Sequence, residues 1–347
     1  MGEAPVKKRK DLDVLIVGGG SFGTALATLL AGTGKTFEMW VRREELAEEI
    51  NTQHTNSRYA SGHTLPDTVR ATTNLAKAVK RATAILMAVP SRSFRDVARA
   101  VGDTIQGDQV LVHTTKGFEI ETFKRMSTIL REETCTLKTG VFSGPNLAGE
   151  IMAGDPAGAT VASHYDEVVH AIQDLFAGSG RIRVYGGHDV VGTEVGSAFK
   201  NIIALAAGAS DGMGFGDNTK SLLLTRGLSE MARIGVALGA DVFTFSGLTG
   251  VGDLMCTCAS PLSRNHQVGD RLAKGEALDD ILHSMTQVAE GVPTTKAVQR
   301  YAESVGLDLP IVKAVYRLLF EDWKVPDALA QLMDLPVGDE LAALRYR

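Results

Sequence analysis

Residues 14–23 read VLIVGGGSFG, a short run of aliphatic residues followed at once by three glycines. The run predicts a buried strand, and Gly18, Gly20 and Gly23 have the spacing G-x-G-x-x-G. In a dinucleotide-binding loop the first glycine permits a tight turn, the second lets the backbone approach a pyrophosphate, and the third lets the next helix pack closely on the strand. Because the loop also opens a helix expected over residues 21–30, we favour this interpretation over a glycine-rich turn without a ligand.

Strands and helices continue to alternate beyond this loop. Further strands are expected at 36–41, 84–89, 110–112 and 141–142, with helices at 44–51 and 94–101. Alternation of this kind predicts a mostly parallel sheet with helices on its faces. After residue 187 only helices are expected, at 195–209, 220–238, 278–285, 294–305 and 311–320. The predicted fold class is therefore α/β, with a flexible basic tail over 1–12, a Rossmann-like doubly wound sheet over 13–189 and an all-α C-terminal domain over 190–347.

The composition is that of an ordinary globular protein, with 44% hydrophobic and 22% charged residues. The length of 347 residues predicts about two domains, and the formal net charge of -5 gives no electrostatic footprint for nucleic acid. No stretch approaches the roughly 20 apolar residues of a spanning helix, so no membrane partner is expected. The basic residues 7–10 are interpreted as a solvated tail, with a nuclear signal or a lipid contact as alternatives.

The number and spacing of the cysteines bear on the cellular compartment and on whether the protein binds a metal. Cys135, Cys256 and Cys258 are too few, and odd in number, for a disulfide framework, which predicts a reducing, cytoplasmic location. The pair Cys256 and Cys258 offers too few ligands for zinc, and no histidine completes the set. We therefore expect no metal and interpret these side chains as small apolar ones.

The second expected strand ends at two arginines, Arg42 and Arg43. A site for NAD usually has Asp or Glu here to bind the ribose 2′-hydroxyl, whereas Arg suits the 2′-phosphate of NADP. The residues therefore favour NADP over NAD as the cofactor. The alternative is a pair of solvated arginines, partly neutralised by Glu44 or Glu45.

Three charged residues stand alone in uncharged stretches. Lys116 follows the fourth expected strand, at the edge where open α/β sheets bind ligands. Lys200 is the only charge in residues 195–209, and a helix that is apolar on every side is buried, so this lysine needs a partner or a ligand. Asp253 is the only charge in GLTGVGDLM. The alternatives are a loop lysine in water, a lysine that snorkels to the surface, and an aspartate that caps a helix.

Ser263, Arg264 and Asn265 form a dense group of hydrogen-bond donors shortly after Asp253. Arginine suits bidentate recognition of phosphate, and the alternative is a solvated turn. The sequence has no Ser-His-Asp order, no H-E-x-x-H and no histidines at metal-ligand spacing. The chemistry predicted from the residues is therefore that of a cofactor, two lysines, an aspartate and an anion-binding group.

Six motifs carry a resemblance to a known family: GGGSFGTALA, TTKGFE, SGPNLAGE, FKNIIALAAG, GVGDLMCTC and SRN. With them the sequence resembles the NAD(P)-dependent sn-glycerol-3-phosphate dehydrogenases over residues 13–332. The resemblance implies a Rossmann-like domain followed by an all-helical domain, and a cytoplasmic homodimer. It also implies reversible NAD(P)H-dependent reduction of dihydroxyacetone phosphate to sn-glycerol 3-phosphate, for glycerophospholipid synthesis.

The resemblance also implies a role for individual residues. The residues expected to contact the dinucleotide are Ser21, Phe22, Arg42, Lys116, Ala148 and Arg264, with Val288 and Glu290 closing the nicotinamide end. The residues expected around the substrate are Lys116, Gly144, Asn146, Asn201, Asp253, Thr257, Ser263, Arg264 and Asn265. Lys200 is expected to be the general acid and base, with Lys116 and Asp253 beside it. Asn146, Asn201 and Thr257 match the animal-type enzymes, whereas many bacterial members have Ser or Thr in place of Asn146, and Phe22 stands where Tyr or Trp is commoner.

Two other functions fit part of the pattern. A β-hydroxyacid or ketopantoate-type reductase shares the domain plan and an active lysine, but the phosphate-binding group at Arg264 argues against it. A non-catalytic NADP-binding protein, such as a redox sensor, shares the glycine loop. The presence of Lys116, Lys200 and Asp253 together argues against that class.

Overall fold

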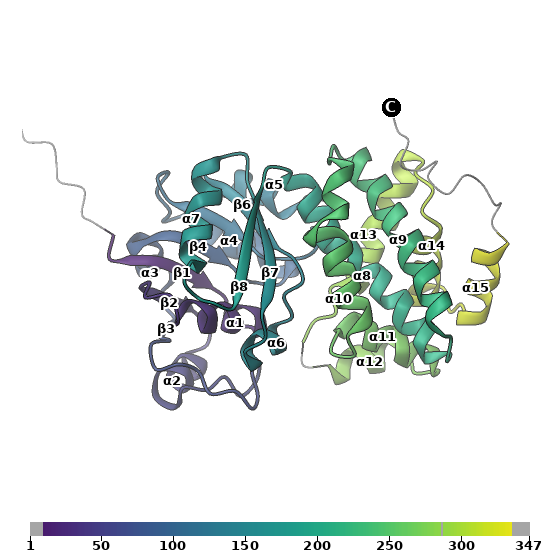
Figure 1. The fold of residues 1–347 in the computed structure, drawn as a ribbon, viewed down its shortest axis with the longest axis horizontal. Helices are drawn as coiled ribbons and strands as arrows, with labels where there is room; N and C mark the ends of the chain where they lie inside the picture. Colours follow the sequence, from purple (N-terminus) through teal and green to yellow (C-terminus); the bar gives the residue numbers. More distant parts are fainter. Residues whose placement is uncertain (1–9, 286, 335–347) are drawn as a thin grey trace, which may run out of the picture.

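The structure is a computed structural model that describes residues 10–285 and 287–334. Most of the expected basic tail, residues 1–9, lies outside the described residues. A sheet flanked by helices and a group of helices lie side by side, and the chain passes from the first to the second at residues 188–189 (Figure 1). The predicted fold class, an α/β sheet followed by helices, is confirmed.

The sheet has eight strands in the order β3-β2-β1-β4-β5-β6-β7-β8. Their bounds are β1 Leu12–Val17, β2 Phe37–Trp40, β3 Ala71–Thr72, β4 Ala82–Met87, β5 Val110–His113, β6 Thr139–Ser143, β7 Ala157–Ala162 and β8 Ile182–Gly187. All neighbouring strands run parallel except β6 and β7, which are antiparallel. Strands β3, β7 and β8 are additions to the strands expected from the sequence. The strand order reverses beside β1, which is where open α/β sheets bind ligands.

The central strands β1, β4 and β5 are buried on both faces, as the continuous apolar runs predict. In β1, Val14 and Ile16 belong to one hydrophobic core, whereas Leu15 and Val17 belong to the other. Helices α1 (Ser21–Leu30), α2 (Glu44–Gln53) and α7 (Asp166–Phe176) supply the first core. Helices α3 (Leu75–Arg81), α4 (Phe94–Gly102) and α5 (Met126–Glu133) supply the second, and α6 (Ala148–Ala153) follows β6.

The glycine loop joins β1 to α1 as its spacing requires. Gly18 has φ +126°, and a Cβ there would lie 2.4 Å from the carbonyl oxygen of Ala88. A Cβ on Gly23 would lie 2.0 Å from the carbonyl oxygen of Gly18, so only glycine lets α1 pack this closely on the strand. The helix begins at Ser21 and ends at Leu30, as predicted.

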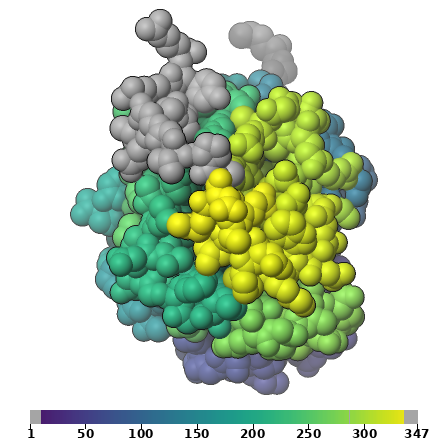
Figure 2. Space-filling model, turned by 90° about the vertical axis from the view of Figure 1, so that its right-hand side faces the viewer, coloured from purple at the N-terminus to yellow at the C-terminus, as the bar shows by residue number. Residues whose placement is uncertain are grey.

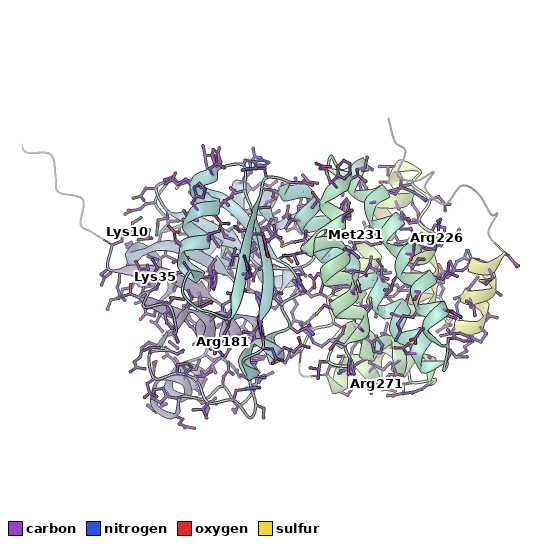
Figure 3. All side chains as sticks on the ribbon, viewed as in Figure 1. Lys10, Lys35, Arg181, Arg226, Met231 and Arg271 are labelled. Carbon is purple, nitrogen blue, oxygen red and sulfur yellow. The ribbon has the colours of Figure 1, made fainter. Side chains whose placement is uncertain are left out.

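The helical part is built around α8 (Val190–Gly212). The other helices are α9 (Asp217–Ala237), α10 (Asp253–Ala259), α11 (Arg264–Ala273), α12 (Leu278–Ser284), α13 (Gly291–Val305), α14 (Pro310–Phe320) and α15 (Val325–Met333). Helix α15 lies on the outer face, far from the sheet (Figures 1 and 2). Helix α9 is amphipathic: Met231 is buried among the helices, whereas Arg226 is exposed (Figure 3).

Helix α8 corrects one expectation. Among the described helices it is the one long and apolar enough to cross a membrane, but 89% of its most apolar window is buried inside the protein. The expectation that no stretch approaches this length is therefore wrong. The helix begins five residues earlier than predicted because Asp189 caps it, accepting the N–H of Gly192 at 2.8 Å. It is the core of the helical part.

Candidate active site

A cleft of about 810 Å³ lies between the sheet and the helices. Its wall on the sheet side begins at Gly20, where α1 presents its N-terminus without any side-chain cap. Most residues predicted for the site line this cleft: Gly20, Ser21, Phe22, Lys116, Asn146, Ala148, Lys200, Asn201, Thr257, Ser263, Arg264, Asn265, Val288 and Glu290. The uncapped N–H groups of α1 suit an anion such as a pyrophosphate.

Two lysines from different parts of the chain meet on one buried carboxylate. Lys116 comes from the loop after β5, and its Nζ lies 2.8 Å from Oδ2 of Asp253. Lys200 comes from α8, and its Nζ lies 2.6 Å from Oδ1 of the same carboxylate. Asp253 is 1% exposed and Lys200 4% exposed, so this charge cluster is largely removed from water. Lys200 also donates a hydrogen bond to the hydroxyl of Thr257.

Lys116 makes further contacts besides the one with Asp253. Its Nζ donates to the carbonyl oxygen of Gly144 and to Oδ1 of Asn146, each at 3.1 Å. Burial lowers the pKa of Lys116 to about 8, with Lys200 adding to the decrease and Asp253 opposing it. A lysine with this pKa exchanges a proton readily near neutral pH.

Asn146 offers a free donor beside Lys116. Its Oδ1 accepts the lysine, whereas its Nδ2 is buried and has no hydrogen-bond partner within the described chain. A buried amide left without a partner is uncommon in proteins. This N–H pair is therefore a group that a ligand oxygen can satisfy.

The chain reaches Asp253 through an unusual turn. Residues Leu248–Gly252 form a π-helical turn in which Gly250 departs from helical dihedral angles, and Asp253 is the first residue of α10. Asp253 makes no capping hydrogen bond to α10, so the alternative of a helix cap does not hold. The turn instead leaves the carboxylate to the two lysines. Turns of this kind occur often at functional sites.

The predicted anion-binding group opens α11. Ser263 caps this helix, accepting the N–H of His266 at 3.3 Å. Asn265 accepts the N–H of Gly291 at 2.9 Å, which leaves its amide donor for a ligand. Arg264 lines the cleft and donates from Nη1 to the carbonyl oxygen of Val288 at 2.7 Å. The close crossing that brings α11 to α8 depends on Gly208, where a Cβ would lie 1.9 Å from the carbonyl oxygen of His266.

Other predicted residues lie away from the cleft wall. Gly18 and Gly23 shape the loop from behind, and Gly144 and Asp253 reach the cleft through their contacts with the lysines. Arg42 is exposed just beyond β2 and is not among the residues that line the cleft. Its contact with a 2′-phosphate stays a prediction.

Sequence reasoning missed several residues of the cleft. Ser91, which follows β4, does not line the cleft itself but donates twice to Glu290 in its wall, from the N–H at 3.1 Å and from Oγ at 2.6 Å. Its place beyond the carboxyl end of a strand is the signal that also identified Lys116. Tyr59 contributes its carbonyl oxygen, which accepts Ser21 Oγ at 2.6 Å. Other missed cleft residues are Arg58, His63, Arg92 and Arg271.

A metal site does not emerge from the described ranges 10–285 and 287–334, because no three His, Cys, Asp or Glu side chains there could hold an ion together. Cys256 lies beside the lysine cluster, and burial raises the pKa of its thiol. A thiol with a raised pKa is a poor nucleophile and a poor metal ligand near neutral pH.

The class of protein follows from these features. The sheet is of the dinucleotide-binding kind, the helical part of the chain packs against it, and a pair of lysines lies in the cleft between them. This arrangement is that of a two-domain dehydrogenase with a nicotinamide cofactor. The chain belongs to the NAD-dependent glycerol-3-phosphate dehydrogenase family. Residues 13–169 match the N-terminal part of this family, and residues 189–330 match its C-terminal part.

Individual relatives agree with this assignment. The chain is 44% identical to a glycerol-3-phosphate dehydrogenase (NAD(P)+) of Bacillus thuringiensis (strain Al Hakam), over 95% of this chain and 98% of that protein. The crystal structure of glycerol-3-phosphate dehydrogenase from Coxiella burnetii is similar at a TM-score of 0.88 and 31% identity, over 93% of this chain and 99% of that one. A ketopantoate reductase from Ralstonia eutropha, at 17% identity and a TM-score of 0.60, shares the fold alone.

Proposed function

We propose that this chain catalyses the reversible NAD(P)H-dependent reduction of dihydroxyacetone phosphate to sn-glycerol 3-phosphate, which supplies glycerophospholipid synthesis. The observation that carries the proposal is the meeting of Lys116 and Lys200 on Asp253. Reduction of a ketone needs a proton donor where negative charge develops on oxygen, and this cluster supplies two ammonium groups there. The relatives are named for the same reaction.

The sheet side of the cleft fits a dinucleotide. Among the described residues, no atom outside the immediate chain neighbours of Gly20 lies within 4 Å of the position of a Cβ there, so the backbone is open to a pyrophosphate at the N-terminus of α1. Ser21, Phe22, Ala148, Arg264, Val288 and Glu290 line the rest of this side. When bound, the reduced nicotinamide supplies the hydride for the ketone carbon. Arg42 supports a preference for NADP over NAD.

Lys200 is the proposed general acid and base. Its Nζ donates a proton to the oxygen that gains negative charge, and accepts one in the reverse reaction. Asp253 and Thr257 hold this Nζ in place, at 2.6 Å for the carboxylate. Lys116 and the free Nδ2 of Asn146 provide further donors for the same oxygen or for a substrate hydroxyl.

The substrate phosphate is assigned to the start of α11. Arg264 and the amide of Asn265 offer donors there, and Ser263 fixes the first turn of the helix. Binding energy from the phosphate, which does not react, then holds the ketone carbon in place. A substrate that lacks the phosphate loses this contribution.

We also propose a domain boundary near residue 189, a homodimer and a cytoplasmic location. The family matches end at residue 169 and resume at residue 189, and β8 ends at Gly187, which supports the boundary. The homodimer and the location follow from the resemblance, and the sparse, free cysteines support a reducing compartment.

The direct test is to mix the purified chain with NADPH or NADH and dihydroxyacetone phosphate, and to follow the absorbance band of the reduced nicotinamide. We expect rapid oxidation with this substrate and none with ketopantoate, and a product that is sn-glycerol 3-phosphate by chiral analysis. Turnover of ketopantoate instead would move the chain to the reductase class. Cofactor binding without any turnover would identify a non-catalytic binding protein.

A further inference from the structure

The segment that directly follows Lys116 crosses from one domain to the other. Residues 117–125 join β5 to α5 and therefore belong to the sheet part of the chain. Phe118, two residues after Lys116, is nevertheless 2% exposed and belongs to the hydrophobic core of the helical part, the same cluster as Phe199 and Val298. The loop that carries Lys116 is thus packed into the helical domain, which carries Lys200.

A stack of three aromatic rings extends the contact between this segment and the helical part. Phe118 stacks on Phe123 with ring centroids 4.5 Å apart, and Phe123 stacks on Tyr301 of α13 at 4.3 Å and 11° between the planes. Phe123 is therefore held between a ring of its own segment and a ring of the helical part. Aromatic pairs at these distances are attractive beyond the area that they bury.

The backbone at Phe123 is strained. Its φ of +56° lies in the left-handed region, which a bulky residue adopts only when its surroundings impose it. Residues 118–125 form a short hairpin closed by an antiparallel bridge between Phe118 and Arg125. Two hydrogen bonds of this hairpin impose the conformation: Phe123 N–H donates to Glu119 O at 2.8 Å, and Glu119 N–H donates to Lys124 O at 2.9 Å. The strained conformation aims the ring at Tyr301.

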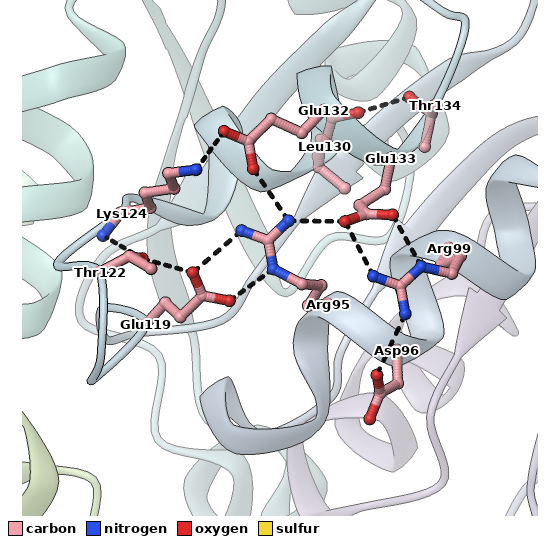
Figure 4. Close-up of polar contacts among 10 residues, drawn as sticks. All are labelled: Arg95, Asp96, Arg99, Glu119, Thr122, Lys124, Leu130, Glu132, Glu133 and Thr134. Carbon is pink, nitrogen blue, oxygen red and sulfur yellow. Dashed lines mark hydrogen bonds and ion pairs between the residues drawn. The ribbon is translucent and has the colours of Figure 1, made fainter.

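The opposite side of the hairpin is fastened to the sheet part (Figure 4). Glu119 accepts two hydrogen bonds from Arg95 of α4, at 2.6 and 2.9 Å, and Lys124 lies 2.6 Å from Glu132 of α5. At the base of the hairpin, Arg125 forms an ion pair with the buried Glu194 of α8. The segment is therefore held by both parts of the chain at once.

We propose that residues 117–125 are an interdomain anchor, in which Phe123 and Tyr301 are positioning residues that hold Lys116 against Asp253. The 2.8 Å contact joins atoms of two domains, so its length depends on how the domains sit relative to each other. The anchor fixes the relative position of the two domains close to Lys116, because Phe118, only two residues further on, is packed in the helical core. The inference rests on the proposed function, because it gives Lys116 a part in the reaction.

The experiment compares kcat, KM, NADPH affinity and melting temperature for wild type, Phe123→Leu, Tyr301→Leu and the double variant. Each single variant should lower kcat about ten-fold, since small displacements of a reacting group have effects of this size or larger, and should leave NADPH affinity unchanged. The double variant should be no slower than either single one, because both remove the same contact. Phe320→Leu is the matched control: this ring also contacts a tyrosine, Tyr316 at 5.1 Å in a tilted arrangement, but both residues lie on α14.

The pH profile of kcat distinguishes a role of the anchor in positioning Lys116 from a role in stabilising the fold alone. Lys116 has its pKa near 8 because it is buried, and the titratable groups that face it are Asp253, Lys200 and Cys256. Loosening the anchor admits water to Lys116, which raises its pKa, and weakens the contact with Asp253, which lowers it. Because burial is the larger of the two causes, the alkaline limb of the profile should move to higher pH in Phe123→Leu and Tyr301→Leu but not in Phe320→Leu. Phe123→Gly should melt higher than Phe123→Ala, because glycine relieves the strain, yet lose as much activity.

Wild-type kcat and an unmoved alkaline limb in both leucine variants would overturn the anchor, even if both melt lower. A double variant whose loss of kcat equals the product of the two single losses would also overturn the anchor, because Phe123 and Tyr301 would then act independently. If Phe123→Leu does not fold, Tyr301→Leu makes the same test from the other domain. Failure of the wild-type chain to turn over dihydroxyacetone phosphate is a different result, which overturns the proposed function itself.

Discussion

Two buried carboxylates of the helical part have opposite surroundings. Asp253 faces the two ammonium groups of Lys116 and Lys200. Glu230 of α9, 4% exposed, faces two backbone N–H groups at the start of α14, those of Ile311 at 2.7 Å and Val312 at 3.2 Å. One carboxylate is surrounded by full positive charges and the other by the partial charges of a helix N-terminus.

The difference shows what burial does to a charge. Burial raises the pKa of Glu230 to about 7, although the two N–H groups act in the opposite direction. Glu230 thus joins α9 to α14 as a carboxyl group that is about half protonated at neutral pH, unlike a carboxyl group in water. Around Asp253 two cations compensate one anion, which leaves excess positive charge facing the cleft. That excess is what a developing oxyanion needs.

Removing the ammonium of Lys200 is the largest expected effect. Lys200→Met keeps the unbranched stem, and Lys116 still pairs with Asp253, so the fold and NADPH affinity should persist. A positioned acid or base contributes about 10²–10⁴-fold in rate, and kcat should fall by that factor. Turnover, NADPH binding and melting should be measured on one preparation. A variant that binds NADPH normally and turns over within a few-fold of wild type would move the role to Lys116.

Removing the charge of Asp253 tests the same cluster through stability. Asp253→Asn leaves two buried ammonium groups without an anion, and breaking a buried pair in this way typically costs about 3–5 kcal/mol. The loss should shrink at higher pH, because removing Asp253 lowers the pKa of Lys116 further and lets it become neutral. Urea unfolding at two pH values measures both effects.

Asp211→Asn is the control for this prediction. Asp211 also has two partners, Lys220 and His266, each at 2.7 Å, but its side chain is partly exposed. Its replacement should cost about 1 kcal/mol or less, because water screens the exposed charges. Equal losses for Asp253→Asn and Asp211→Asn would contradict the idea that the lysine pair depends on a buried counter-charge.

The sequence predicts the cluster around Asp253 better than it predicts the buried carboxylate of Glu230. Lys200 stands out because one charge interrupts a long apolar stretch, and burial at that position follows from the neighbours alone. Glu230 does not stand out, since it lies in a helix with other polar residues and its partners are about 80 residues away. The same holds for Phe118, whose place in the core of the other domain depends on how the two domains dock.

Strands show the same limit of local reasoning. The runs around Val14 and Ile85 are continuous and apolar, and the pattern predicts both strands. Strand β8, by contrast, reads IRVYGG and is mostly exposed or half-buried, and β3 has two residues. Such edge strands are defined by the neighbours they pair with, which a local pattern does not contain.

Replacing Glu230 should have an effect of the opposite sign to Asp253→Asn. Because the pKa of Glu230 is about 7 in the folded state, above the ordinary value of 4.5 expected for the unfolded chain, the folded chain binds more protons between these two values. The free energy of unfolding should therefore fall as pH rises from about 4.5 to about 7. Glu230→Gln removes this dependence and should stabilise the protein at pH 8 by up to roughly 3 kcal/mol.

Denaturant unfolding across this pH range measures the prediction, with exposed Glu276→Gln as the control. The glutamine oxygen can still accept the N–H groups of Ile311 and Val312, so the helix junction is retained. A Glu230→Gln variant that is less stable than wild type at pH 8 would show that the ionised carboxylate itself holds α14.

Arg42 extends the comparison to a charge in water, where the smallest effect is expected. It is exposed, unlike the cations around Asp253, so solvent and salt screen it. If it binds the 2′-phosphate, Arg42→Ala removes charged hydrogen bonds worth about 1.5 kcal/mol or more, and NADPH should weaken roughly ten-fold relative to NADH. Titrating both cofactors at low and at high salt measures this ratio, with exposed Arg226→Ala as the control far from the cleft (Figure 3). The discrimination should decrease as salt rises, whereas equal losses for NADPH and NADH would show that Arg42 does not recognise the phosphate.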